Sequence, residues 1–126
     1  MPDSEYMSQP QLDFFRGRLL EMREEVLSRQ AAILEQLNSH ETAADPADRA
    51  TAEEEYSLAL RLRERESMLV RKIDESLARI RNKDYGYCEK TGEPIGIPRL
   101  LARPTATVCV HVKDQDERLE LHFKSR

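Results

Sequence analysis

The chain has 126 residues and a mass of 14.6 kDa, which allows one domain, or one small domain with a large appendage, and excludes two full-sized cores. Charged residues make up 35% of the chain and aromatic residues only 6%, with four Gly and no Trp, so long solvated helices are favoured over a β-sandwich or barrel. The net charge of −4 argues against the uniformly basic surface of a module that binds duplex DNA.

The sequence gives no indication of export or of a membrane anchor. No apolar run approaches the roughly 18 residues that span a bilayer. The N-terminal residues contain no basic segment followed by an apolar stretch, so we expect no secretory signal. We therefore expect a cytoplasmic protein that does not bind membranes, in which Cys88 and Cys109 are thiols rather than a disulfide.

The N-terminal part of the chain predicts one long helix. Residues 1–10 are polar and are expected to be flexible. From Gln11 to about His40, apolar side chains recur at spacings of three, four and seven, which predicts a helix of roughly 28 residues. Its expected apolar stripe is Leu12, Phe15, Leu19, Met22, Val26, Ile33 and Leu37. A second set is expected to broaden that face: Phe14, Leu20, Leu27 and Leu34.

A second long helix is predicted after a break at residues 41–47. It runs from about Pro46 to Asn82, because no Pro or Gly follows its first residue. Its expected stripe is Tyr56, Ala59, Val70, Ile73, Leu77 and Ile80, with Leu58, Leu62 and Leu69 alongside. Two such helices bury their stripes most simply as an antiparallel hairpin over residues 11–82, a finger on the order of 40 Å long with its tip at residues 41–52.

The amino-acid composition changes after Asn82. Residues 83–112 hold three of the four glycines and three of the six prolines, which favours a compact knuckle of turns with a short hairpin. In residues 113–126, Leu119 and Phe123 lie four apart and predict a short C-terminal helix. The expected fold class is therefore mainly α, a helical hairpin that carries a small globule.

Cysteine spacing in the knuckle bears on metal binding. A closed four-thiolate zinc site with a Cys-x-x-Cys pair at each end needs further cysteines at positions 91 and 112, which are Thr91 and Val112. We therefore expect no metal site. Cys88 and Cys109 then form either a redox pair, if the fold brings the two thiols together, or inert packing.

The hairpin tip allows two interpretations. Asp45 is a good N-cap, Pro46 suits the first helical position, and Asp48 lies three residues after the cap, as in a capping box. On the first interpretation, the only role of these residues is to stabilise the start of the helix. Alternatively, carboxylates at the end of a long finger are placed to reach a partner.

A set of cations also has two interpretations. Arg65, Leu69 and Lys72 share one helix face because they are spaced by four and three. Arg99, Arg103 and Lys113 fall in or just after the knuckle. Such a cluster suits a phosphate-rich ligand, since Arg grips phosphate oxygens bidentately. The alternative is an ordinary solvated face.

The whole pattern resembles a known family. The chain is similar to the DksA/TraR family of bacterial transcription factors in the segments DPADRATAEEEYSLALRLRERE and DYGYCEKTGEPIGIPRLLARPTATVC, and the match extends from about Gln11 to Lys113. The resemblance implies a non-enzymatic regulator that inserts a coiled-coil finger into the secondary channel of RNA polymerase. There it would modulate initiation, for example at ribosomal RNA promoters, together with ppGpp. It also implies no sequence-specific DNA binding, and we expect a monomer.

The resemblance assigns roles to individual residues. The family's tip residues correspond to Asp45, Asp48 and Ala50. Its ppGpp-contacting residues, at a site shared with the polymerase, correspond to Arg65, Leu69, Lys72, Arg103 and Lys113, with Arg99 nearby.

The family's four zinc-binding cysteines are reduced here to Cys88, Thr91, Cys109 and Val112, as in zinc-independent paralogues. The knuckle is then expected to be held by packing of Tyr85, Tyr87, Ile95, Ile97, Leu100 and Val108. The rival interpretation is a thiol redox sensor or helical-hairpin adaptor with no polymerase role.

Overall fold

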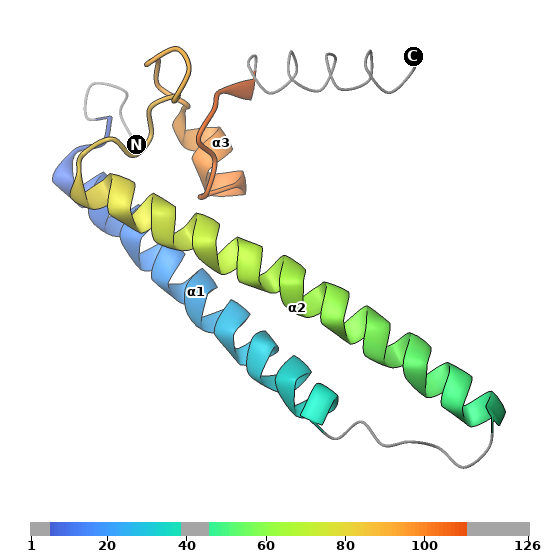
Figure 1. The fold of residues 1–126 in the computed structure, drawn as a ribbon. Helices are drawn as coiled ribbons and strands as arrows, with labels where there is room; N and C mark the ends of the chain where they lie inside the picture. The colour runs from blue at the N-terminus through green and yellow to red at the C-terminus, as the bar shows by residue number, and fades with distance from the viewer. Residues whose placement is uncertain (1–5, 39–45, 111–126) are drawn as a thin grey trace, which may run out of the picture. The chain divides into compact units, whose positions relative to one another are not determined.

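The computed structural model of the chain is mainly helical and describes residues 6–38 and 46–110. It contains helices α1 (Gln9–Asn38), α2 (Pro46–Arg81) and α3 (Ile97–Ala102), drawn in Figure 1. The described residues contain no β-strand, and the only extended pairing among them is one antiparallel bridge between Tyr87 and Pro94. The predicted mainly α fold with a long helical hairpin is confirmed, whereas the predicted C-terminal helix lies outside the described residues.

The chain forms two compact units, and both long helices take part in each. One unit comprises residues 20–74, here called the hairpin unit. The other comprises residues 1–19 and 75–126, here called the globule unit.

In the hairpin unit, α1 and α2 run antiparallel and are held in register by polar pairs. Arg29 donates to both carboxylate oxygens of Glu66, at 3.1 and 3.0 Å. Gln30 donates to the Ser67 hydroxyl at 2.9 Å, and Arg23 pairs with Asp74 at 2.8 Å. Buried apolar side chains lie along the same seam: Val26, Ile33, Ala59 and Ile73.

The buried stripe is narrower than the sequence predicts. The second set on α1 stays 40–44% exposed, namely Phe14, Leu20, Leu27 and Leu34. On α2, Tyr56, Leu58 and Leu62 are also exposed, whereas Glu66 is buried. The expectation that these apolar residues broaden the core is therefore wrong for the described structure. A helix that packs on one neighbour buries only one narrow face, since a wider apolar face needs a third layer.

The globule unit packs around aromatic rings. Phe15 and Tyr85 are buried with their ring centroids 5.6 Å apart, and the Tyr85 hydroxyl donates to the Pro104 carbonyl at 2.8 Å. Of the six residues expected to hold the knuckle, Tyr85, Ile95 and Leu100 are buried, and Tyr87, Ile97 and Val108 are half-buried. Packing around Tyr85, to which Phe15 of α1 contributes, thus gives the globule unit a core.

Candidate functional site

Two of the three expected tip residues, Asp48 and Ala50, lie near the start of α2. Helix α2 begins at Pro46, and Asp48 and Ala50 are both exposed. A carboxylate in a first helical turn interacts favourably with the helix dipole, so Asp48 can support α2 while it remains accessible to a partner. Asp45 lies outside the described residues.

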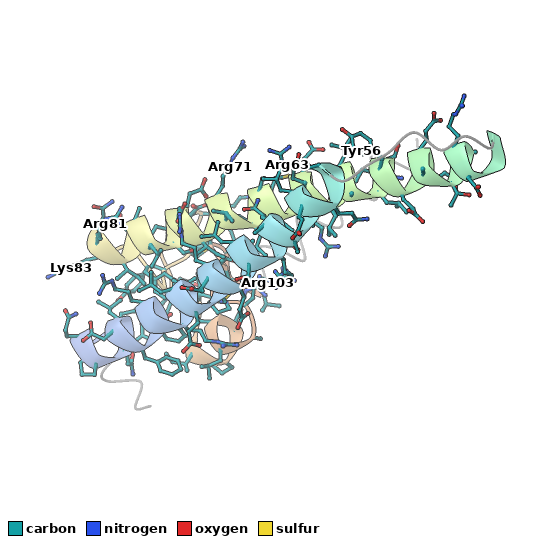
Figure 2. The ribbon with its side chains drawn as sticks, turned by 90° about the horizontal axis from the view of Figure 1, so that it is seen from below. Tyr56, Arg63, Arg71, Arg81, Lys83 and Arg103 are labelled. Atoms are coloured by element: carbon teal, nitrogen blue, oxygen red, sulfur yellow. The ribbon has the colours of Figure 1, made fainter. Side chains whose placement is uncertain are left out.

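The α2 members of the expected nucleotide site share one face of the hairpin unit. Arg65 and Lys72 are exposed, and Leu69 between them is half-buried. Spacings of four and three bring the three side chains onto neighbouring positions of the helix surface. The arrangement offers two cations around one apolar contact. Arg71, next in sequence to Lys72, projects from α2 on the side away from α1 (Figure 2).

The other expected cations lie around α3 in the globule unit. Arg99 and Arg103 line a pocket of about 610 Å³, together with Ile95, Pro98, Ala102 and Val110. Arg99 is oriented by a hydrogen bond of 2.9 Å from its Nε to the Val108 carbonyl. Its two terminal nitrogens make no hydrogen bond or ion pair to the described part of the chain. Lys113 lies outside the described residues.

Three of the four positions that correspond to the family's zinc-binding cysteines are joined by hydrogen bonds, namely Cys88, Thr91 and Cys109. Cys88 is buried and Cys109 is half-buried, and both are free thiols. Burial alone raises the pKa of the Cys88 thiol, but it is outweighed by hydrogen bonds from the Thr91 hydroxyl and from the backbone N–H groups of Cys109, Thr91 and Lys90. These bonds favour the thiolate and lower its pKa to about 6.

These positions do not fit a structural zinc ion. Thr91 contributes a neutral hydroxyl, which also accepts a hydrogen bond from the Glu93 N–H at 3.3 Å. Val112, which lies outside the described residues, has no ligating atom. Across residues 6–38 and 46–110, no group of three or more His, Cys, Asp or Glu is placed to hold a metal ion. Two thiols are half of the closed ligand set that such a zinc site needs.

Arg79 is a structural residue that the sequence analysis missed. Its guanidinium donates to the carbonyls of Asp84 and Tyr87, at 3.0 and 2.7 Å, and pairs with Glu89 at 3.3 Å. One side chain near the end of α2 thereby fixes the turn that leads to Cys88. Its position among other arginines of a charged helix gives no local signal of this role.

Tyr6 is the second residue that was missed, because residues 1–10 were expected to be flexible. Helix α1 already begins at Gln9, and the Tyr6 hydroxyl contacts the backbone of both Gly86 and Gly96. These contacts join residues 80 and 90 positions apart. No local pattern of polarity could reveal them.

None of the described helices carries an apolar stretch long enough to cross a lipid bilayer.

Comparisons with known proteins cover nearly the whole chain. The family described as DnaK suppressor protein DksA, N-terminal domain, matches residues 11–80. The prokaryotic dksA/traR C4-type zinc finger matches residues 83–118. The RNA polymerase-binding transcription factor DksA of Caulobacter vibrioides is 44% identical over 119 residues, which cover 94% of this chain and 84% of that protein.

Two further relatives agree with this assignment. DksA of Escherichia coli strain K12 is 44% identical over 117 residues, covering 89% of this chain and 75% of the relative. The solved structure of transcription factor DksA2 from Pseudomonas aeruginosa is 48% identical, with a TM-score of 0.89, and the match covers 97% of this chain and 95% of that one. The chain therefore belongs to the DksA/TraR family, whose members are transcription factors and not enzymes.

Proposed function

We propose that this chain binds RNA polymerase in the cytoplasm and modulates transcription initiation with its hairpin tip, which enters the secondary channel. Two curated relatives at 44% identity are named for polymerase binding. The exposed positions of Asp48 and Ala50 near the start of α2 suit a contact with a partner. Asp45 is proposed to act beside them.

The second part of the proposal is a shared ppGpp site. The observation that carries it is the pocket in the globule unit, where Arg99 and Arg103 lie beside the apolar residues Ile95, Pro98 and Ala102. Guanidinium groups bind phosphate oxygens bidentately, so this pocket suits a nucleotide that carries two pyrophosphate groups. Arg65, Leu69, Lys72 and Lys113 are proposed to complete the factor's side of the site, and the polymerase would supply the rest.

The third part is that the factor works without zinc. Its support is the donor set, because Thr91 and Val112 stand where thiolates would be needed. Hydrogen bonds and aromatic packing would then stabilise the knuckle in place of the metal. Such a factor would keep its activity where zinc is scarce.

The parts of the chain are proposed to divide these tasks. Residues 11–82 would form the finger that enters the polymerase, residues 83–112 the zinc-finger-like knuckle that carries Arg99 and Arg103, and residues 113–126 the C-terminal helix that supplies Lys113. We expect the protein to be a monomer. Because its proposed partner is RNA polymerase, we also expect that it does not read DNA sequence directly.

Co-elution with core RNA polymerase on gel filtration tests the proposal against the redox-sensor or adaptor alternative. We expect the chain to co-elute with the polymerase. The Asp48→Asn variant should also co-elute, because the remaining length of the hairpin and the globule still contact the enzyme. Absence of the chain from the polymerase fractions at micromolar concentrations would favour the alternative.

Binding of labelled ppGpp gives a second test. The isolated chain should bind ppGpp weakly, since it carries only part of the site, and addition of polymerase should raise the affinity. Equal affinity with and without polymerase would contradict a shared site.

A further inference from the structure

Within the globule unit, Tyr6 joins the segment before α1 to the knuckle, residues 83–112. Its hydroxyl donates to the Gly86 carbonyl at 2.5 Å and accepts from the Gly96 N–H at 3.0 Å. Its ring meets that of Tyr87 edge to face, with centroids 5.6 Å apart and planes at 88°. One side chain thus connects two turns that are ten residues apart in the knuckle.

The bridge extends a short backbone pairing. The Gly86 carbonyl also accepts a hydrogen bond of 2.8 Å from the Ile95 N–H, next to the Tyr87–Pro94 bridge. Tyr6 therefore satisfies the backbone N–H of the residue that follows this pairing, Gly96. Burial raises the pKa of Tyr6 above its ordinary value and outweighs the opposing hydrogen bond from Gly96. The hydroxyl, which is protonated at neutral pH as in any tyrosine, can therefore donate to the Gly86 carbonyl.

Met7 also packs closely against the knuckle. It has a φ of 55°, an uncommon conformation for a residue other than glycine, and its N–H donates to the Gln11 side chain at 2.7 Å. A Cβ atom at Gly86 would lie 2.9 Å from Cγ and Sδ of Met7. Gly86, with a φ of 91°, therefore leaves space that Met7 and Tyr6 occupy.

Tyr6 also contacts the start of the helix that carries the cations. Gly96 is the residue before α3, and its carbonyl accepts the first helical hydrogen bond, from the Leu100 N–H at 3.1 Å. No side chain caps α3 through its Gly96 N-cap position. The Tyr6 hydroxyl is thus the group that fixes the Gly96 N–H, three residues before Arg99.

We propose that Tyr6 is a positioning residue for the anion pocket: its bridge between Gly86 and Gly96 fixes the start of α3 and thereby the direction of Arg99 and Arg103. A six-residue helix has little stability of its own and takes its orientation from the groups at its ends. Tyr6 holds Gly96 at the start of α3, and Arg99 within α3 donates from its Nε to the carbonyl of Val108, a residue that follows the helix. The ligand of this pocket rests on the proposed ppGpp function, but the positioning can be measured without ppGpp.

The test compares Tyr6→Phe with Tyr56→Phe in the full chain. Tyr6→Phe keeps the ring against Tyr87 and removes both hydrogen bonds, whereas Tyr56 lies on α2 in the hairpin unit (Figure 2). By NMR, we expect exchange with water of the Gly96 N–H and of the Arg99 Nε–H to become roughly 5- to 10-fold faster in Tyr6→Phe only, as expected for loss of about one hydrogen bond. The Gly92 N–H, which donates to the Cys88 carbonyl, is an internal control that should not change.

A functional measurement separates positioning from general stability. With polymerase present, the half-maximal ppGpp concentration for transcription inhibition should rise several-fold in Tyr6→Phe, while inhibition at saturating ppGpp stays unchanged. A chain that begins at Met7 provides a second variant with the same expected effects.

Each outcome bears on one proposal. Unchanged exchange at Gly96 and Arg99 would overturn the positioning role, and so would faster exchange with an unchanged ppGpp response. If the wild-type factor itself shows no response to ppGpp, the proposed nucleotide function fails, and the positioning of α3 is then decided by the exchange rates alone.

Discussion

At the scale of single residues, Cys88 combines burial with a stabilised thiolate. Hydrogen bonds from Thr91 and from three backbone N–H groups offset its burial and lower its pKa from 9.0 to about 6. Because the unfolded chain holds this proton more tightly, the stability that the thiolate contributes rises between pH 6 and 9 and is lost as the pH falls through about 6.

This thiolate can be observed directly. In a Cys109→Ser background, absorbance at 240 nm should titrate with a midpoint near pH 6. Cys88→Ser should abolish that transition. A midpoint above pH 8 would show that the hydrogen bonds around Cys88 do not stabilise its charge.

The cations of the proposed nucleotide site should each contribute to ppGpp sensitivity. Loss of one charge-assisted contact typically costs on the order of 1.5 to 3 kcal/mol, so Lys72→Ala and Arg103→Ala should each lose roughly 10- to 100-fold in ppGpp sensitivity. The matched control is Arg71→Ala, which removes an exposed arginine that projects from α2 on the side away from α1 (Figure 2). Equal half-maximal ppGpp concentrations for all three variants and wild type would identify the cations as a solvated face.

At the scale of elements, the hairpin contains an ion pair in its seam. Glu66 is 8% exposed and lies seven residues from both Ala59 and Ile73, so a carboxylate occupies a position where an apolar residue would be expected. Arg29 compensates this charge with two hydrogen bonds. The hydrogen bonds to the Glu66 carboxylate stabilise the charged guanidinium and thereby raise the pKa of Arg29.

The two partners should therefore respond differently to substitution. Arg29→Met leaves a buried carboxylate without its cation and should lower the free energy of unfolding by about 1 to 3 kcal/mol. Glu66→Leu should be neutral or stabilising, because an apolar side chain then completes the seam. Urea denaturation followed by circular dichroism measures both. The control is Arg23→Ala, whose exposed pair with Asp74 should contribute under about 1 kcal/mol. A larger loss from Glu66→Leu than from Arg29→Met would contradict this account.

The long helices could be predicted from the sequence, because apolar periodicity and the absence of Pro and Gly are local properties. The face that each helix buries was predicted only in part. Leu20, Leu27 and Leu34 are as apolar as the buried residues, and only the number of packed layers decides their exposure. Glu66 was missed because its burial depends on Arg29, which is 37 residues away.

The candidate site was predicted through family resemblance rather than through chemistry. Periodicity placed Arg65, Leu69 and Lys72 on one face, but it could not place Arg99 and Arg103 in a pocket, since α3 follows a run of turns. Tyr6 could not be predicted at all, because its partners lie 80 and 90 residues further along the chain.

At the scale of the whole molecule, metal content tests how the knuckle is held. Elemental analysis should find well under one zinc per chain, and a strong chelator should leave the melting temperature unchanged. The matched positive control is the double variant Thr91→Cys with Val112→Cys, which restores four thiols and should take up zinc. Stoichiometric zinc in the wild-type chain, with loss of structure on chelation, would contradict a metal-free knuckle.

We propose that the exposed Asp48 carboxylate at the start of α2 acts on RNA polymerase during initiation. Single-round transcription in vitro from a ribosomal RNA promoter, with the factor and ppGpp present, tests it most directly. Asp48→Asn preserves side-chain size and removes the charge, and Glu54→Gln removes a charge from an exposed residue of the same helix and serves as the control.

We predict that the wild-type factor and Glu54→Gln reduce the transcript, whereas Asp48→Asn binds polymerase and leaves the transcript at its level without factor. Full inhibition by Asp48→Asn, or no change in transcript with the wild-type factor, would contradict a role of the Asp48 carboxylate in initiation.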